Sequence, residues 1–141
     1  MAGTDLQPAL DPTHLAVSRW PVDWRPREVP EPFVALVRDE HETTLVCSEA
    51  ATASYDGAKG ISALGVEVGW RRITFPGPLP WEQVGFLAEV ATRLARAQIP
   101  FTSLAGFTTD HVLVRAAQAD LAVEVLRGNE PPEPRPGTTN P

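Results

Sequence analysis

Short apolar runs and alternating positions predict strands in the first half of the chain. Residues 14–20, 33–38 and 43–48 are rich in β-branched and other apolar side chains. The last two runs flank a charged corner, Asp39-Glu40-His41-Glu42, which indicates a hairpin. Residues 21–32 hold too many prolines for a helix or an interior strand, so we expect an extended crossing segment there.

The clearest patterns of the second half lie in residues 66–75 and 81–98. The stretch VEVGWRRITF alternates from Trp70 and predicts a strand, which ends at PGPLP. A helical period follows, with apolar residues at Val84, Leu87, Ala88, Ala91, Leu94 and Ala95. Residues 50–65 could hold a short helix, although Gly57 and Gly60 disfavour it.

The order of the predicted elements favours a layered α+β fold. Residues 99–104 and 110–116 are the next predicted strands, and residues 119–126 form a short amphipathic helix that Gly128 can end. The predicted order of elements in the second half is therefore β-α-β-β-α. The first half could be a diverged copy of the same unit. This order predicts ferredoxin-like layering, with helices on one face of an antiparallel sheet.

Composition narrows the class of protein. The net charge of −6 argues against nucleic acid as a partner, and the single cysteine, Cys47, excludes an internal disulfide. Residues 1–13 are expected to be a flexible arm, and residues 129–141, with five prolines, a disordered tail. No apolar run reaches the length of a membrane span and the first residues do not resemble a secretion signal, so a cytoplasmic location is expected.

No set of side chains with a catalytic or metal-binding pattern stands out. His14, His41 and His111 are scattered, and no nucleotide-binding motif is present, so we predict no cofactor, no metal site and no enzymatic activity. The only candidate catalytic residues are the carboxylates of Glu40, Glu42 and Glu49. A charged hairpin corner accounts for these acidic residues better than an active site does.

Two features of the second half favour a binding site over a catalytic one. The stretch GPLPWEQVG leads into a predicted helix, whose free N–H groups favour an anion. The corner GFTTD ends in Asp110, whose carboxylate could hold an ammonium or guanidinium group. The two features together suit a zwitterion, whereas Asp110 could equally be a turn residue that bonds the corner backbone.

Several motifs of the second half resemble the ACT domain family. These are the strand ending in G-P-L, the helix opening V-G-F-L-A, the strand entry A-x-I-P and the corner T-x-D-H-V-L-V. Upstream, E-T-T-L-V-C is similar to the first-unit strand of one branch of that family. This branch comprises small bacterial two-ACT proteins and the CASTOR-type arginine sensors. The resemblance covers residues 14–127 and is closest over 70–127.

The resemblance implies two tandem βαββαβ units, a degenerate one at residues 14–65 and a second at 66–128. It implies a non-catalytic regulatory protein that binds an amino acid at an interface between units. Because the arginine sensors hold four units in one chain, a homodimer is also implied. The arginine sensors carry an acidic residue at the position of Gln83, so arginine specificity does not follow. The binding residues carried over by position are Gln83, Val84, Gly85, Phe86, Pro100, Phe101, Gly106, Phe107, Thr108 and Asp110.

A second interpretation remains open, in which the chain is a protein-interaction or dimerisation module without a small ligand. The sequence feature that supports this interpretation is the uncharged helix face around Phe86 and Val90, which could bind a partner protein. The two interpretations differ in whether any metabolite stabilises the fold.

Overall fold

The computed structural model describes residues 3–76 and 85–130. Predicted binding residues Gln83 and Val84, and most of the expected disordered tail, lie outside the described residues. The elements are β1 (Ala9–Leu10), β2 (Leu15–Trp20), β3 (Ala35–Arg38), β4 (Thr43–Ser48), α1 (Glu49–Tyr55), η1 (Ala58–Gly60), β5 (Gly65–Thr74), α2 (Phe86–Arg96), β6 (Phe101–Ala105), β7 (Asp110–Arg115), η2 (Ala116–Gln118) and α3 (Ala119–Leu126).

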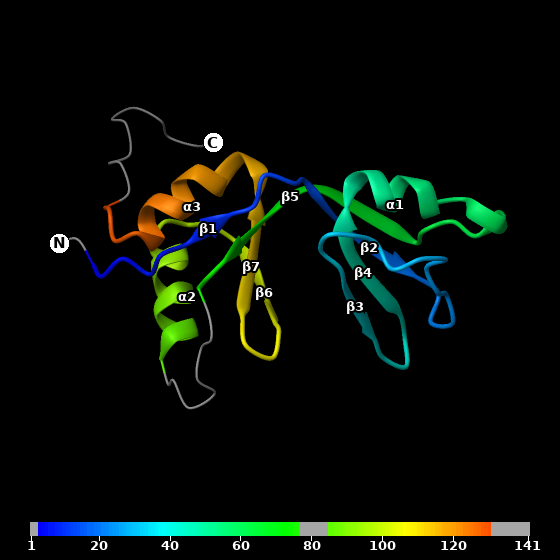
Figure 1. Cartoon of the computed structure of the whole chain (residues 1–141), viewed down its shortest axis with the longest axis horizontal. Coiled ribbons are helices and arrows are strands. Elements are labelled where there is room, and N and C mark those ends of the chain that lie inside the picture. The colour runs from blue at the N-terminus through cyan, green and yellow to red at the C-terminus, as the bar shows by residue number, and fades with distance from the viewer. Residues whose placement is uncertain (1–2, 77–84, 131–141) are drawn as a thin grey trace, which may run out of the picture.

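The strands form one antiparallel sheet in the order β3-β4-β2-β5-β7-β6, and β1 pairs with β5 (Figure 1). The long strand β5 joins two halves, because its first part pairs with β2 and its last part, from Trp70 to Thr74, pairs with β7. The strands expected from the apolar runs are confirmed, with ends shifted by one or two residues. The chain has the ferredoxin-like α+β fold with a curled antiparallel sheet.

The two halves share one order of neighbours. In the C-terminal half, β5, β6 and β7 are completed by β1, giving β6-β7-β5-β1. In the N-terminal half the order is β3-β4-β2-β5. Helix α2 connects β5 to β6, whereas residues 21–34 connect β2 to β3 without a helix, as their prolines predict.

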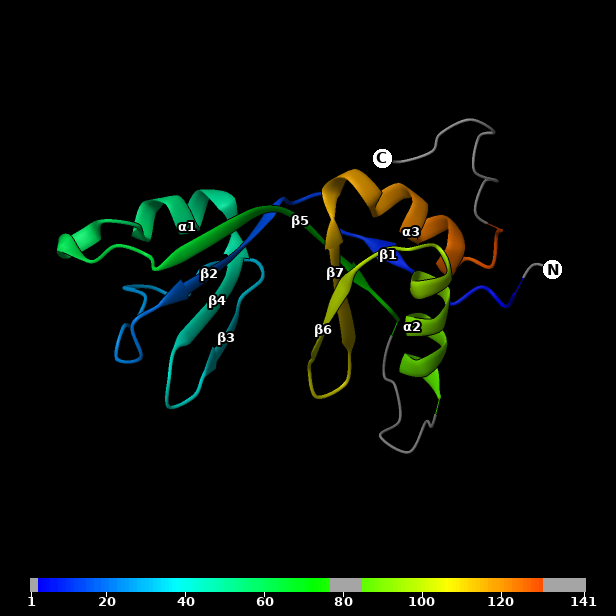
Figure 2. The ribbon, with the colours of Figure 1, turned by 180° about the vertical axis from the view of Figure 1, so that it is seen from behind.

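Helices α2 and α3 cover one face of the C-terminal half (Figure 2). Their buried residues Val90, Leu94 and Leu126 pack with Ile73 of β5 and Val112 of β7 in one apolar cluster. Burying a side chain of this size contributes roughly 1.5–3 kcal/mol. Val90 is fully buried in this cluster and Phe86 packs against it. The prediction that this helix face meets a partner is therefore wrong, because the same apolar positions fill the core.

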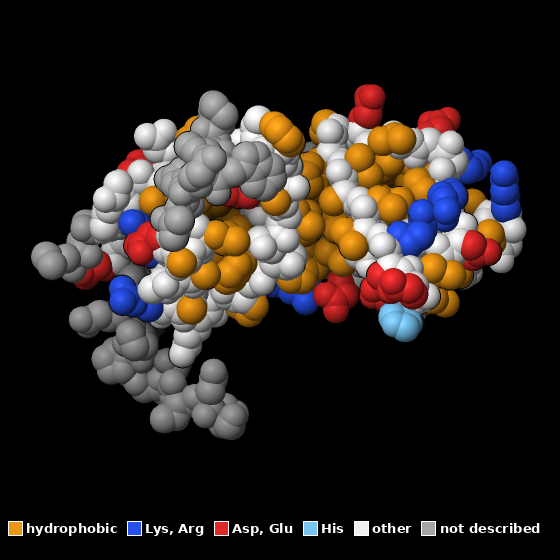
Figure 3. Space-filling view, turned by 90° about the horizontal axis from the view of Figure 1, so that it is seen from below, with side chains coloured by type: hydrophobic (Ala, Val, Ile, Leu, Met, Phe, Trp, Pro, Cys, Tyr) orange, Lys and Arg blue, Asp and Glu red, His pale blue; other side chains and the backbone are white. Residues whose placement is uncertain are grey.

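The opposite face of the sheet carries a second cluster that joins the halves. Leu15, Val46 and Leu113 are buried in it, with Phe33 and Trp70 partly buried beside them. Leu113 points away from the helices because its neighbours Val112 and Val114 point toward them. In Figure 3 apolar side chains gather in the middle of the molecule, between the halves.

Residues 3–13 do not form the flexible arm that their polar composition suggests. The N–H of Leu6 donates to the carbonyl of Leu126 at 3.0 Å, and Ala9 and Leu10 pair with β5. Arg93 also donates to the carbonyl of Thr4 at 2.6 Å. The segment is ordered because the backbone edge of β5 and the end of α3 supply partners that are distant in sequence.

Candidate functional site

Gly85 opens α2 in the left-handed region, with φ 93°, a conformation that residues with a Cβ rarely adopt. No side chain caps this helix among the described residues, and the first bond of the helix runs from the N–H of Glu89 to the carbonyl of Gly85. The N–H groups of Phe86, Leu87 and Ala88 therefore precede the first donor of the helix and have no acceptor within it. This geometry favours an anion at the helix start.

The corner between β6 and β7 is closed by a hydrogen bond from the N–H of Gly106 to the carbonyl of Thr109, at 2.7 Å. Phe107 at its tip is 81% exposed, and Thr108 is exposed beside it. Asp110 opens β7, and its carbonyl accepts the N–H of Phe75 at 3.3 Å. Among residues 3–76 and 85–130, no hydrogen bond or ion pair engages the half-buried carboxylate of Asp110.

The structure brings only part of the predicted set together. In Figures 1 and 2, the start of α2 and the β6–β7 corner lie at the same end of the C-terminal half. Pro100 and Phe101 precede or open β6 and lie at its other end. Phe86 and Phe101 also pack on the core, and the rings of Phe75 and Phe86 meet edge to face at 5.1 Å. The predicted site residues Phe86 and Phe101 therefore both contribute to the core packing of the fold.

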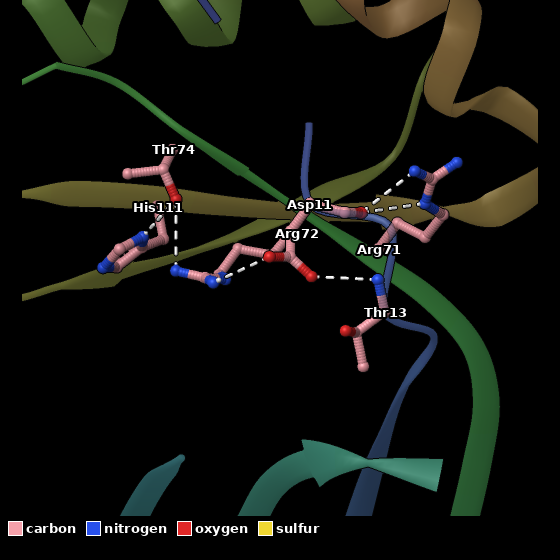
Figure 4. Close-up of polar contacts among 6 residues, drawn as sticks. All are labelled: Asp11, Thr13, Arg71, Arg72, Thr74 and His111. Atoms are coloured by element: carbon pink, nitrogen blue, oxygen red, sulfur yellow. Dashed lines mark hydrogen bonds and ion pairs between the residues drawn. The ribbon is translucent and has the colours of Figure 1, made fainter. Parts of the chain in front are cut away.

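A polar network behind the corner was not predicted as part of the site (Figure 4). Nδ1 of His111 lies 2.8 Å from Oγ1 of Thr74, and its Nε2 lies 3.2 Å from Oγ1 of Thr109. Arg72 donates to Oγ1 of Thr74 at 3.3 Å. Burial, then the charge of Arg72, lowers the pKa of His111 below 6.5, against an opposing effect of Asp110. The sequence shows His111 next to Asp110, but not the hydroxyls that flank its ring.

Asp11 links this network to the N-terminal segment. Its carboxylate pairs with Nη2 of Arg72 at 3.3 Å and accepts the N–H of Thr13 at 2.9 Å, while its carbonyl accepts two hydrogen bonds from Arg71. Partial burial acts to raise the pKa of Asp11, but the bonds from Thr13 and the two arginines outweigh it and hold the pKa below 3.8.

Phe33, from the N-terminal half, closes over the same network. The guanidinium carbon of Arg72 lies 4.3 Å from the centre of its ring, and the ring of His111 meets it edge to face at 5.4 Å. Nε of Arg72 is buried and has no hydrogen-bond partner among the described residues. The corner that carries Asp110 therefore rests on groups from both halves.

Two of the three carboxylates considered for an enzyme are engaged with separate partners, and no hydrogen bond or ion pair of the third, Glu40, is found among the described residues. Glu42 pairs with Arg19 at 2.6 Å, and Glu49 accepts the N–H of Gly69 at 2.8 Å. No group of three or more His, Cys, Asp and Glu side chains within the described ranges is placed to hold a metal ion. Of the helices in the described part of the chain, none has the length and apolar character to cross a membrane.

Residues 65–128 match the ACT domain family. This ACT segment runs from the start of β5 through α3 and includes Gly85 and the corner that ends in Asp110. No curated protein sequence matches the chain.

Solved structures with the same fold are known from several bacteria. A Vibrio cholerae protein of unknown function, described as a possible transport protein, is 22% identical with a TM-score of 0.66 over 89% of this chain and 90% of that one. A protein from Agrobacterium tumefaciens is 21% identical with a TM-score of 0.64 over 81% of each chain. The regulatory subunit of aspartate kinase from Thermus thermophilus is 11% identical with a TM-score of 0.61 over 84% of this chain and 93% of that one. At these identities the likeness concerns the fold.

Proposed function

We propose that the protein is a non-catalytic regulatory protein that binds an amino acid at an interface between ACT units. The observation that carries the proposal is the unengaged carboxylate of Asp110 at the end of the ACT segment that also holds the start of α2. The resemblance to a regulatory subunit in overall fold agrees with it. The cytoplasmic location expected from the sequence is part of the same proposal.

The ligand is bound through its two charged groups. Its carboxylate accepts hydrogen bonds from the N–H groups of the first turn of α2, whose dipole favours negative charge. Its ammonium group pairs with Asp110. Gly106, Phe107 and Thr108 surround the ligand from the corner, and Gly85 lets the ligand approach the backbone closely. Pro100 and Phe101, at the other end of β6, are proposed to serve the neighbouring unit.

The interface follows from the arrangement of two units. We propose a degenerate first unit over residues 14–65 and a second over residues 66–128, with β5 shared between them. The common neighbour order of the two halves supports this division. The CASTOR-type arginine sensors hold four units per chain, so two copies of this chain would supply the same number. We therefore include a homodimer in the proposal.

The test is a thermal-shift screen of the full chain against the common amino acids and related amines at millimolar concentration. A ligand at about one hundred times its Kd adds roughly 2.7 kcal/mol of stability, which raises Tm by several degrees. Asp110→Asn should abolish the shift without changing Tm in the absence of ligand. The matched control is Asp120→Asn, because Asp120 is an exposed carboxylate in the first turn of α3. A shift that survives Asp110→Asn would remove Asp110 from the site.

A ligand-free dimerisation module is the second candidate. It is favoured by exposed apolar residues on two strands: Val37 of β3 is 58% exposed and Val68 of β5 is 57% exposed. β3 is also an outer strand of the sheet, with one backbone edge unpaired among the described elements. If no metabolite raises Tm while the mass in solution is that of a dimer, and Val37→Lys makes it a monomer, this candidate replaces the first.

A further inference from the structure

The N-terminal half holds a pocket of about 290 Å³, separate from the corner that carries Asp110. Its inner wall includes Trp24 and Tyr55, each 7% exposed, and the more exposed Ile61. The cations of Arg25, Arg27 and Lys59 also line it. The pocket therefore combines an apolar wall with cationic groups.

The wall is rigid because the crossing segment is anchored in the core. The rings of Trp20 and Trp24 stack at 3.9 Å with an angle of 10°, and Tyr55 meets Trp24 edge to face at 5.9 Å. The hydroxyl of Tyr55 donates to the carbonyl of Glu28 at 2.9 Å, which ties α1 to the segment. A pocket whose walls are fixed in this way loses little entropy when it binds a ligand.

The charge of the pocket is opposite to that of the chain. Three cationic residues and one carboxylate, Asp23, line it, whereas the chain has a net charge of −6. Within the described residues, none of Arg25, Arg27 and Lys59 makes an ion pair, although Nη1 of Arg25 donates to the carbonyl of Trp24 at 3.1 Å. Cations without a carboxylate partner beside an apolar wall favour an anionic ligand.

Lys59 reaches the pocket from a strained backbone. Its φ is 55° and its ψ is 27°, in the left-handed region, and it follows Gly57 and precedes Gly60, which also have positive φ. Lysine rarely adopts this conformation, and it is the only lysine of the chain. Glycine would fit the position without strain, and strain of this kind is frequent at binding sites.

We propose that this pocket is a second ligand site, which binds a small organic anion with an apolar body. The apolar body lies against Trp24, Tyr55 and Ile61, and the anionic group contacts Lys59 and the two arginines. The volume admits a single ring with a short chain. The proposal does not depend on amino-acid binding at Asp110.

The test measures binding of 4-phenylbutyrate and phenyl phosphate to the full chain by calorimetry, with ¹H–¹⁵N NMR to locate the site. 4-Phenylbutyramide, which has the same shape as the first probe and no charge, is the ligand control. We expect at least one anion to bind, to shift the indole N–H signal of Trp24, and to bind more tightly than the amide. The two probes distinguish a carboxylate from a phosphate as the preferred group.

Variants separate binding from folding. Lys59→Gly should weaken anion binding by about fivefold, as expected for loss of one partly exposed charged contact, while Tm stays unchanged or rises because the strain is relieved. Arg25→Ala combined with Arg27→Ala should weaken it further. The control Arg127→Ala removes a cation that pairs with Glu124 on α3 and should have no effect.

Three results would overturn the proposal: neither anion binds, the amide binds as tightly as its acid, or the Lys59 and arginine variants bind as the original chain does. Asp110→Asn should leave anion binding intact, so failure at one site is distinguishable from failure at the other.

Discussion

Nδ1 of His111 lies 2.8 Å from Oγ1 of Thr74, and this contact joins β7 to β5 just behind the corner that carries Asp110. The other ring nitrogen contacts Thr109 within the corner. A neutral imidazole offers one donor and one acceptor, which suits two hydroxyl partners. The guanidinium of Arg72 beside it disfavours a second positive charge.

The stability of the fold should fall as pH decreases through about 6.5. Burial and Arg72 lower the pKa of His111 in the folded chain, so near this pH the unfolded chain binds more protons than the folded one. The stability that neutral His111 contributes is complete above pH 6.5 and is lost as the pH falls toward the lowered pKa of His111. Thermal unfolding between pH 5 and pH 8 should show a smaller pH dependence for His111→Gln than for the original chain. An identical dependence would show that His111 does not titrate in this range.

Arg93 holds the N-terminal segment against the two helices. It donates to the carbonyls of Thr4 and Leu126 and pairs with Glu89 at 2.8 Å, with its side chain 11% exposed. Arg93→Ala should cost about 2 kcal/mol, because the carbonyl of the buried Leu126 and that of Thr4 lose a charged donor. Tm should fall by roughly 5–10 °C. Hydrogen exchange at the N–H of Leu6 should accelerate. The control is Arg96→Ala, an exposed arginine in the same turn, and an equal loss there would contradict the assignment.

Trp24 lies in the segment that connects β2 to β3 without a helix. It is buried against Trp20 and Tyr55. Trp24→Ala should destabilise the fold by about 3–5 kcal/mol, whereas Trp24→Phe, which retains an aromatic ring, should cost less than half as much. Urea unfolding measures both. Equal stability of the alanine variant and the original chain would mean that the crossing segment is not anchored by this ring.

Cys47 should be inert in the folded chain. It is fully buried, and burial raises the pKa of its thiol above 9.0 despite the hydrogen bond with Thr52. Since the thiolate is the reactive form, alkylation at pH 8 should be on the order of a hundredfold slower than in urea. Labelling followed by mass spectrometry measures both rates. Rapid labelling without denaturant would indicate local opening of β4.

Part of the site could be predicted from the sequence and part could not. The glycine before α2, the corner from Gly106 to Asp110 and the proline-rich crossing are local features, so their residue types predict their conformation. Pro100 and Phe101 lie at the other end of β6 from that corner, and only the direction of the strand decides this. The contacts of His111 with Thr74 and of Arg72 with Asp11 join residues that are far apart in the chain, and no local pattern indicates them.

The sequence by itself determined the strands from β2 to β7, helices α2 and α3 and their order, because hydrophobic period, proline content and glycine position act within a few residues; β1 was not predicted and α1 was left open. It also carried the resemblance to the ACT family, which the match over residues 65–128 supports. The tertiary structure decided that residues 3–13 are bound to β5 and α3, that the uncharged face of α2 is core, and that three cations meet beside Trp24 and Tyr55. The physical reason is that a free backbone edge, a buried face and a pocket are each made by segments distant in sequence, so they exist only once the chain has folded.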